Sequence, residues 1–288
     1  MECRGAQPAA QAAELLDTAK IPYVSFGWLT IALLSFDAGL GEVEFVVRDQ
    51  DSDAAREALV DEGFHLCKDP NCRELLNDRC PPSQDRPQCV PAEEQRMTPS
   101  ELDAFFALNA QHLIADAHFH LDFQYEKCTV LSLYKKSSIL RWIPVLEADP
   151  RNDDPSFLWL SNDSARLPEA RLDGPSGPWT QLYPVRFLNP TSFCETLLLL
   201  LCRDYGHVKC RDFSWRTMWE TLVENQVPLN RPLRLDFKPM WEAAEDFLLQ
   251  CMPTSNHFKL MSECRRQLIA NGEIIQAEIP ELDESRMH

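Results

Sequence analysis

Two glutamates one residue apart, Glu42 and Glu44, are the first candidates for chemistry in this chain. They stand at the start of the apolar run Val43 to Val47, whose composition is typical of a buried β-strand. Side chains two apart on a strand share a face, so both carboxylates are placed to meet one cation. The alternative is that both glutamates face solvent and bind nothing.

A second candidate group consists of His118, His120 and Asp122, which alternate with apolar residues. This alternation predicts a strand that carries all three polar side chains on one face. Imidazoles in such a position are suited to act as a general base or as metal ligands. The competing interpretation is a half-exposed histidine pair on an edge strand.

The most concentrated basic part of the chain contains Lys135, Lys136 and Arg141. It is a candidate contact for a phosphate or for the end of a tRNA, and a solvated loop is the alternative. The chain as a whole is acidic, with 28 Lys+Arg against 45 Asp+Glu and a formal net charge of −17. Its overall field therefore repels phosphate backbones, and a nucleic-acid partner would need this local basic patch.

Four of the eleven cysteines, Cys67, Cys72, Cys80 and Cys89, lie close together in the sequence. They invite a zinc site, but zinc ligands usually come in close pairs and these spacings are wider, which argues against zinc. The first residues lack a basic region followed by an apolar one, so we expect reduced thiols and a cytoplasmic protein.

Composition and periodicity predict an α+β fold. No apolar stretch reaches the roughly 20 residues that cross a bilayer, so we expect no membrane partner. Helices and strands alternate up to residue 63, an irregular Cys- and Pro-rich insertion follows at 68–99, and two strands are expected between 117 and 134. The predicted domains are 1–144 and a helical domain at 184–272, joined by a turn-rich linker at 145–183 and followed by an acidic tail at 273–288. Four helices are expected in the helical domain, the first capped by Thr191 or Ser192.

The layout from Tyr23 to Val47 resembles the nucleotidyltransferase superfamily: a strand, a glycine turn, a helix, a loop, and a strand that begins with two acids. In that superfamily a Gly-Gly or Gly-Ser pair cradles the triphosphate, and paired aspartates hold two magnesium ions. The resemblance thus implies a nucleotidyltransferase-like mixed sheet, a substrate-binding role for Gly27, and magnesium as the one cofactor. The chain departs from the pattern, because Trp28 follows Gly27 and glutamates replace the aspartates.

About half of the chain is also similar to a group of uncharacterised fungal proteins with nucleotidyltransferase-like N-terminal halves. The shared motifs are Pro22 to Val24, Glu44 to Val47, Gly63 to Cys67, His118 to His120 and Tyr134 to Ser137. Proteins of this kind are often encoded with natural-product pathways. Fungal proteins once called hypothetical include the arginine-containing cyclodipeptide synthases, which join amino acids taken from aminoacyl-tRNA.

This resemblance favours a transferase of fungal specialised metabolism that makes an arginine-containing cyclodipeptide from aminoacyl-tRNA. The alternatives are a metal-dependent nucleotidyltransferase and a catalytically inactive binding module of the same fold. The sequence carries no indication of an oligomeric state. The residues expected to act in catalysis are Glu42, Glu44, His118, His120 and Asp122, and those expected to bind substrate are Gly27, Lys135, Lys136 and Arg141.

Overall fold

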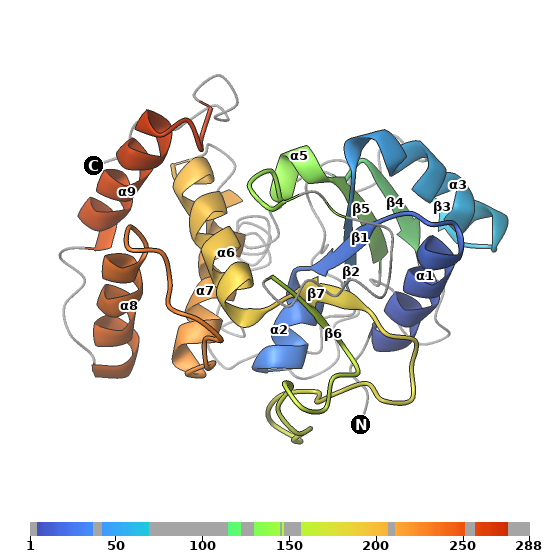
Figure 1. Ribbon diagram of the computed structural model, residues 1–288, viewed down its shortest axis with the longest axis horizontal. Helices are drawn as coiled ribbons and strands as arrows, with labels where there is room; N and C mark the ends of the chain where they lie inside the picture. Colours follow the sequence, from blue (N-terminus) through green and yellow to red (C-terminus); the bar gives the residue numbers. More distant parts are fainter. Residues whose placement is uncertain are drawn as a thin grey trace, which may run out of the picture.

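The structure is a computed structural model that describes residues 5–36, 42–68, 115–121, 130–144, 146, 157–206, 211–250 and 257–275. These residues form an α+β fold with a seven-stranded sheet (Figure 1). The strands are β1 (Tyr23–Phe26), β2 (Val43–Val47), β3 (His65–Leu66), β4 (Ala117–His120), β5 (Val130–Lys135), β6 (Leu158–Leu160) and β7 (Arg186–Leu188). The helices are α1 (Ala6–Thr18), α2 (Trp28–Leu34), the short 3₁₀ turn η1 (Asp49–Asp51), α3 (Ser52–Asp61), α5 (Lys136–Ile139), α6 (Pro190–Asp204), α7 (Arg211–Glu224), α8 (Lys238–Gln250) and α9 (His257–Ala270).

The sheet is mixed, with the strand order β3-β4-β5-β2-β1-β7-β6. β1 and β2 are antiparallel, whereas β5 runs parallel to β2 and β7 runs parallel to β1. β4 is antiparallel to both of its neighbours, β5 and β3, and β6 is antiparallel to β7. The central strand β2 is therefore flanked by one antiparallel and one parallel neighbour.

The predicted α+β class is confirmed, as are the strands Tyr23–Phe26 and Val43–Val47 and the helix Trp28–Leu34. The sheet also contains two strands from beyond residue 144 that the sequence did not indicate. β6 comes from the segment expected to be a linker, and β7 precedes the first helix of the expected helical domain. The division into domains stays a prediction, and the insertion at 68–99 lies, apart from Lys68, outside the described residues.

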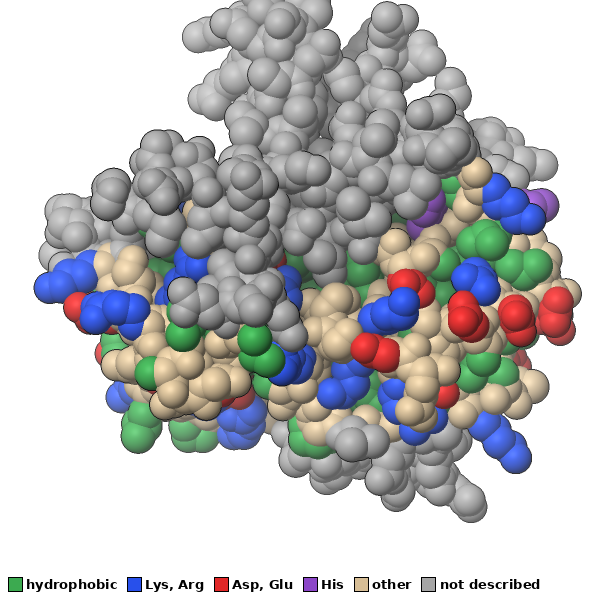
Figure 2. Space-filling model, turned by 90° about the horizontal axis from the view of Figure 1, so that it is seen from above, with side chains coloured by type: hydrophobic (Ala, Val, Ile, Leu, Met, Phe, Trp, Pro, Cys, Tyr) green, Lys and Arg blue, Asp and Glu red, His purple; other side chains and the backbone are tan. Residues whose placement is uncertain are grey.

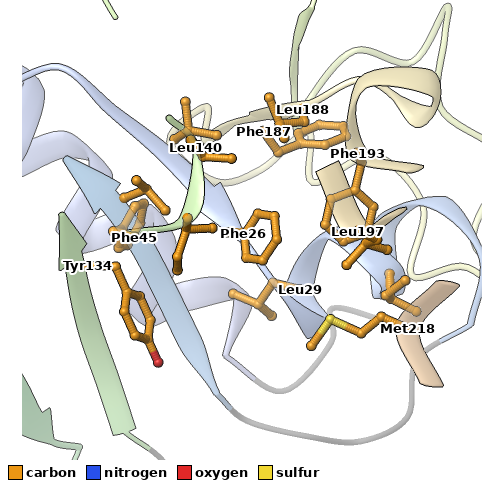
Figure 3. Packing of buried hydrophobic residues seen from close by; sticks show 14 of the residues in the cluster. Phe26, Leu29, Phe45, Tyr134, Leu140, Phe187, Leu188, Phe193, Leu197 and Met218 are labelled. Carbon is orange, nitrogen blue, oxygen red and sulfur yellow. The ribbon is translucent and has the colours of Figure 1, made fainter. Parts of the chain in front are cut away.

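Different helices cover the two faces of the sheet. Tyr23 and Phe45 pack edge to face, and the Tyr23 hydroxyl reaches Asp17 of α1, so α1 lies on the Phe45 face. Phe26 points to the other face, where its ring packs against Phe193 of α6 and Trp215 of α7. Figure 3 shows Phe26 directed at Phe193 and Leu197, and Leu29 of α2 lies on the same side.

Helix α6 joins the sheet to the C-terminal helices. It follows β7 directly, and its residues are almost all buried, because it is enclosed by the sheet and by α7 and α9. Its N-cap is Asn189, whose side chain accepts a hydrogen bond from the Ser192 amide at 2.9 Å, with Pro190 in the first turn. The predicted caps, Thr191 and Ser192, already lie inside the helix.

A buried ion pair fixes α1 to the sheet. The Arg186 guanidinium on β7 donates to the Asp17 carboxylate at 2.7 Å, and both side chains are less than a tenth exposed. The Tyr183 hydroxyl donates to the same carboxylate at 3.0 Å, and Arg186 also stacks on the Tyr23 ring. Burial, first of all, and the neighbouring Asp17 raise the pKa of Tyr23 far above its usual range, so its hydroxyl remains a donor. Within the described ranges, every helix is too short or too polar to span a bilayer.

We expect Asp17→Asn to lower the free energy of unfolding by about 3–5 kcal/mol, because it leaves the Arg186 charge buried without its counter-ion. Urea unfolding followed by circular dichroism measures the change. The matched control is Glu242→Gln, which removes half of the exposed Lys238–Glu242 pair and should cost less than about 1 kcal/mol. Equal effects of the two substitutions would show that the Asp17 pair does not hold the sheet.

Candidate functional site

A row of polar side chains crosses the centre of the sheet on the face that the C-terminal helices cover. The strand registers align Phe26 with Glu44, Glu44 with Ser132, and Ser132 with His118. The amide of Cys67, at the end of β3, donates to the His118 carbonyl at 3.0 Å, which extends the row by one strand. Directly paired residues share a face, so the row runs from the apolar contact at Phe26 to a thiol at Cys67.

Glu44 is 5% exposed, and its carboxylate lies against the backbone of Gly27. A Cβ atom at Gly27 would stand 1.5 Å from Glu44 Oε2, and the glycine has a φ of +74°, a conformation that other residues adopt only with strain. The buried hydroxyl of Tyr134 donates to Glu44 Oε1 at 3.3 Å. The glycine predicted to bind substrate therefore makes room for an acid of its own chain.

Ser132 lies between Glu44 and His118 in the row and is fully buried. Its hydroxyl has no hydrogen-bond partner among the described residues. A buried hydroxyl without a partner destabilises the fold, so its presence in the middle of a central strand needs another explanation. Its place beside the Glu44 carboxylate and the His118 imidazole makes it a candidate contact for a ligand.

The histidines of β4 lie as the alternation predicted, on one face, with ring centroids 5.4 Å apart. His118 is buried and His120 is exposed. The thiol of Cys67 and the two imidazoles place their ligating atoms within 4.8 Å of one another.

The other residues predicted for a site are placed in part. Glu42 is half-buried and directly precedes β2. The predicted catalytic residue Asp122 lies outside the described residues, as do Cys72, Cys80 and Cys89.

The basic residues predicted to bind substrate make contacts within the protein. Lys135 pairs with Asp116, which also accepts a hydrogen bond from Ser52. Burial alone would raise the pKa of Asp116, but the hydrogen bonds from Lys135 and Ser52 lower it below its usual value. This ion pair therefore stabilises the fold above the unfolded-state pKa of Asp116, and the contribution is lost as the pH falls through the lowered value.

The second lysine is more enclosed. Burial lowers the pKa of Lys136, with Asp49 acting against the shift, and its ammonium donates to the Arg141 carbonyl at 3.5 Å. The Arg141 side chain is exposed. On the right of the face drawn in Figure 2, basic and acidic side chains alternate. Lys135 precedes the short helix α5, Lys136 begins it, and Arg141 follows it. The contacts that the structure describes for the three side chains do not converge on one binding site.

The described cysteines of α6 and α9 belong to the core. Cys194, Cys202 and Cys264 are buried and free. Burial raises the pKa of the Cys194 thiol, and a hydrogen bond to Cys264 together with burial raises that of Cys202. The Cys194 and Cys202 thiols therefore stay protonated and are poor nucleophiles.

Sequence reasoning missed Ser132, and it assigned Cys67 to a different group. The signal for Ser132 was its position two residues before Tyr134 in the run Val130 to Tyr134, since both alternate onto the Glu44 face. Cys67 was grouped with cysteines further along the chain, but the pairing of β3 with β4 brings it to the histidines instead.

The contact between Gly27 and the Glu44 carboxylate predicts that a side chain at position 27 clashes with the carboxylate. The cost of this clash can be measured separately from the cost of backbone strain. Gly27→Ala should destabilise the protein by about 1–3 kcal/mol more than Gly63→Ala. Gly63 has a similar φ of +91° but open space around the Cβ position, so its substitution carries only the backbone cost of about 1 kcal/mol. Urea unfolding of both variants, of Glu44→Ala and of Gly27→Ala/Glu44→Ala gives the coupling between positions 27 and 44. If Gly27→Ala costs no more than Gly63→Ala, the carboxylate does not occupy this position.

Ser132→Ala should leave the free energy of unfolding unchanged or raise it by up to about 1 kcal/mol, because it removes a buried hydroxyl that forms no hydrogen bond in the described structure. The matched control is Ser161→Ala, at an equally buried serine whose hydroxyl accepts the Val185 amide at 2.9 Å. That substitution should cost about 1–3 kcal/mol. Chemical denaturation of both variants tests the pair, and a destabilised Ser132→Ala would mean that the hydroxyl has a structural partner.

Comparisons with known protein families, with curated proteins and with solved structures find no match for this chain. The polar row offers one buried carboxylate, a buried hydroxyl, two imidazoles and a thiol on one face of a sheet, and Glu42 directly precedes the strand that carries the carboxylate. These groups can hold a cation and can move a proton.

Proposed function

We propose that this protein is a metal-dependent transferase that acts on a nucleotide, with Glu42 and Glu44 as the cation ligands. The observation that carries the proposal is the buried hydroxyl of Ser132, which has no hydrogen-bond partner among the described residues and lies directly beside Glu44 in the strand register. An acid pair alone is common on protein surfaces, but a neighbouring buried hydroxyl without a partner indicates a site that has a ligand.

The donor set fits one magnesium ion better than two. Magnesium in nucleotide sites is commonly held by one or two carboxylates together with waters and the substrate phosphates. Glu44 on β2 and Glu42, which directly precedes β2, would supply that number, and a bound cation would offset the cost of burying Glu44. The neighbouring strand places Ser132, an uncharged group, opposite Glu44, so the described residues offer no third acid at that position.

The bound cation would neutralise phosphate charge and orient the reacting phosphoryl group. The chain's own contribution is positional. Tyr134 orients one oxygen of Glu44, and the Gly27 backbone limits the other side of the carboxylate. Ser132 extends the site along the row toward β4.

The use of aminoacyl-tRNA, the cyclodipeptide product and a role in fungal specialised metabolism stay predictions. Lys135 and Lys136, the residues expected to contact a tRNA, bind Asp116 and the Arg141 carbonyl instead. A small nucleotide at the acid pair needs neither lysine, which is why we place the nucleotidyltransferase hypothesis first.

The test is magnesium-dependent pyrophosphate release by the purified full chain, measured with each of the four ribonucleoside triphosphates. We expect release with at least one of them, and we expect Glu44→Gln to reduce it at least about 100-fold, because the charge that holds the cation is lost. Glu57→Gln, at an exposed acid of α3, is the matched control and should leave the rate unchanged. If no triphosphate shows magnesium-dependent binding or pyrophosphate release, the result favours the inactive binding module.

A further inference from the structure

We propose that Cys67, His118 and His120 form a binding site for a zinc-class divalent ion. The two imidazoles come from one strand face, and the thiol comes from the end of the neighbouring strand β3. Their ligating atoms all lie within 4.8 Å of one another. The inference does not rest on the proposed nucleotide chemistry, because it concerns a different ligand set at the other end of the row.

The distances suit zinc after small side-chain rotations. Zinc binds sulfur at about 2.3 Å and imidazole nitrogen at about 2.0–2.1 Å with tetrahedral angles, which places the ligand atoms roughly 3.5 Å apart. The ligand atoms must therefore come closer together than they are now. His120 and Cys67 have room to make this movement, because His120 is exposed and Cys67 is only half-buried. His118, which is buried in the sheet, fixes the position of the ion.

The ligand chemistry selects a borderline-soft ion. A thiolate with two imidazoles favours zinc and its relatives over magnesium or calcium, which prefer oxygen ligands. Binding requires the thiolate, so the S–H bond of Cys67 breaks, an S–Zn bond forms, and one proton passes to solvent. Each bound ion therefore releases that thiol proton when the free thiol is protonated.

Three protein ligands leave a tetrahedral ion with one open position. Within the part of the chain that the structure describes, the group contains these three residues and no fourth. His65 pairs directly with His120 across β3 and β4 but does not belong to the group. Sites with three protein ligands characteristically bind a water or a substrate in the fourth position. His120 is exposed, so such a ligand would reach the ion from its side of the group.

Cobalt(II) titration of the metal-free full chain tests the site without any assay of activity. We expect one ion per chain, with a near-ultraviolet thiolate-to-cobalt charge-transfer band that zinc displaces. Cys67→Ala should abolish that band, and His118→Ala and His120→Ala should each weaken zinc binding at least about 100-fold by calorimetry. His65→Ala and Cys72→Ala are the matched controls, since His65 pairs with His120 across the strands and Cys72 is the next cysteine after Cys67 in the sequence, and both variants should leave affinity unchanged. Circular dichroism confirms that each variant is folded.

A band that survives Cys67→Ala, or that disappears in Cys72→Ala, would place the ion on other ligands and overturn the proposal. Loss of zinc affinity in His65→Ala would show that His65 is a fourth ligand, and would refute the proposal that one position on the ion is open. Imidazole added to the cobalt form should shift its visible bands by occupying that position. Unchanged bands would show that the chain already fills it.

Discussion

The pairing of β5 with β2 decides what lies beside Glu44, and the rest of the site follows from that register. Glu44 is opposite Ser132 on one side and Phe26 on the other, and Ser132 is opposite His118. A shift of one residue in this pairing would turn Leu131 or Leu133 toward Glu44 and would send the polar residues of β5 into the apolar face. The same register therefore protects the core and assembles the polar row.

One end of the row is closed by packing and the other is accessible. Phe26 is locked between α6 and α7, so the face is dry and apolar where β1 meets the helices. Gly27 then lets the chain pass directly over the Glu44 carboxylate. Toward β4 and β3 the burial falls, from His118 to the half-buried Cys67 and the exposed His120. This outer end, which carries the two imidazoles and the thiol, is the part of the row that solvent reaches.

Much of the central sheet could be predicted from sequence, because β1, β2 and β5 are apolar runs of ordinary length bounded by turn residues. β6 and β7 could not, since each has three residues inside turn-rich sequence and owes its conformation to neighbouring strands. β7 is held by its parallel contact with β1 and by the Arg186–Asp17 pair, which joins residues far apart in the chain. Local pattern carries no information about such a contact.

The candidate site was predictable in its parts and not in its assembly. Alternation placed His118 and His120 on one face, as the structure has them, and Glu42 and Glu44 at one strand start. The sequence did not reveal that Ser132 separates the acids from the histidines, or that Cys67 joins the histidines, because both facts depend on strand order. The sequence likewise did not reveal that Lys135 pairs with Asp116, because the two residues become neighbours only in the folded chain.

The order of side chains along the row has a chemical consequence. Oxygen ligands stand at the β2 end, whereas nitrogen and sulfur ligands stand at the β4–β3 end, two strands or about 10 Å away at the backbone. A hard cation such as magnesium would therefore bind at the oxygen end of the row and a borderline-soft cation such as zinc at the other end, so the two would not compete. Ser132 lies between the two ends, where a substrate held by one cation would come within reach of groups polarised by the other. Under the proposed function, a bound substrate would supply the hydrogen-bond partner that the Ser132 hydroxyl lacks among the described residues, and would offset the cost of burying it.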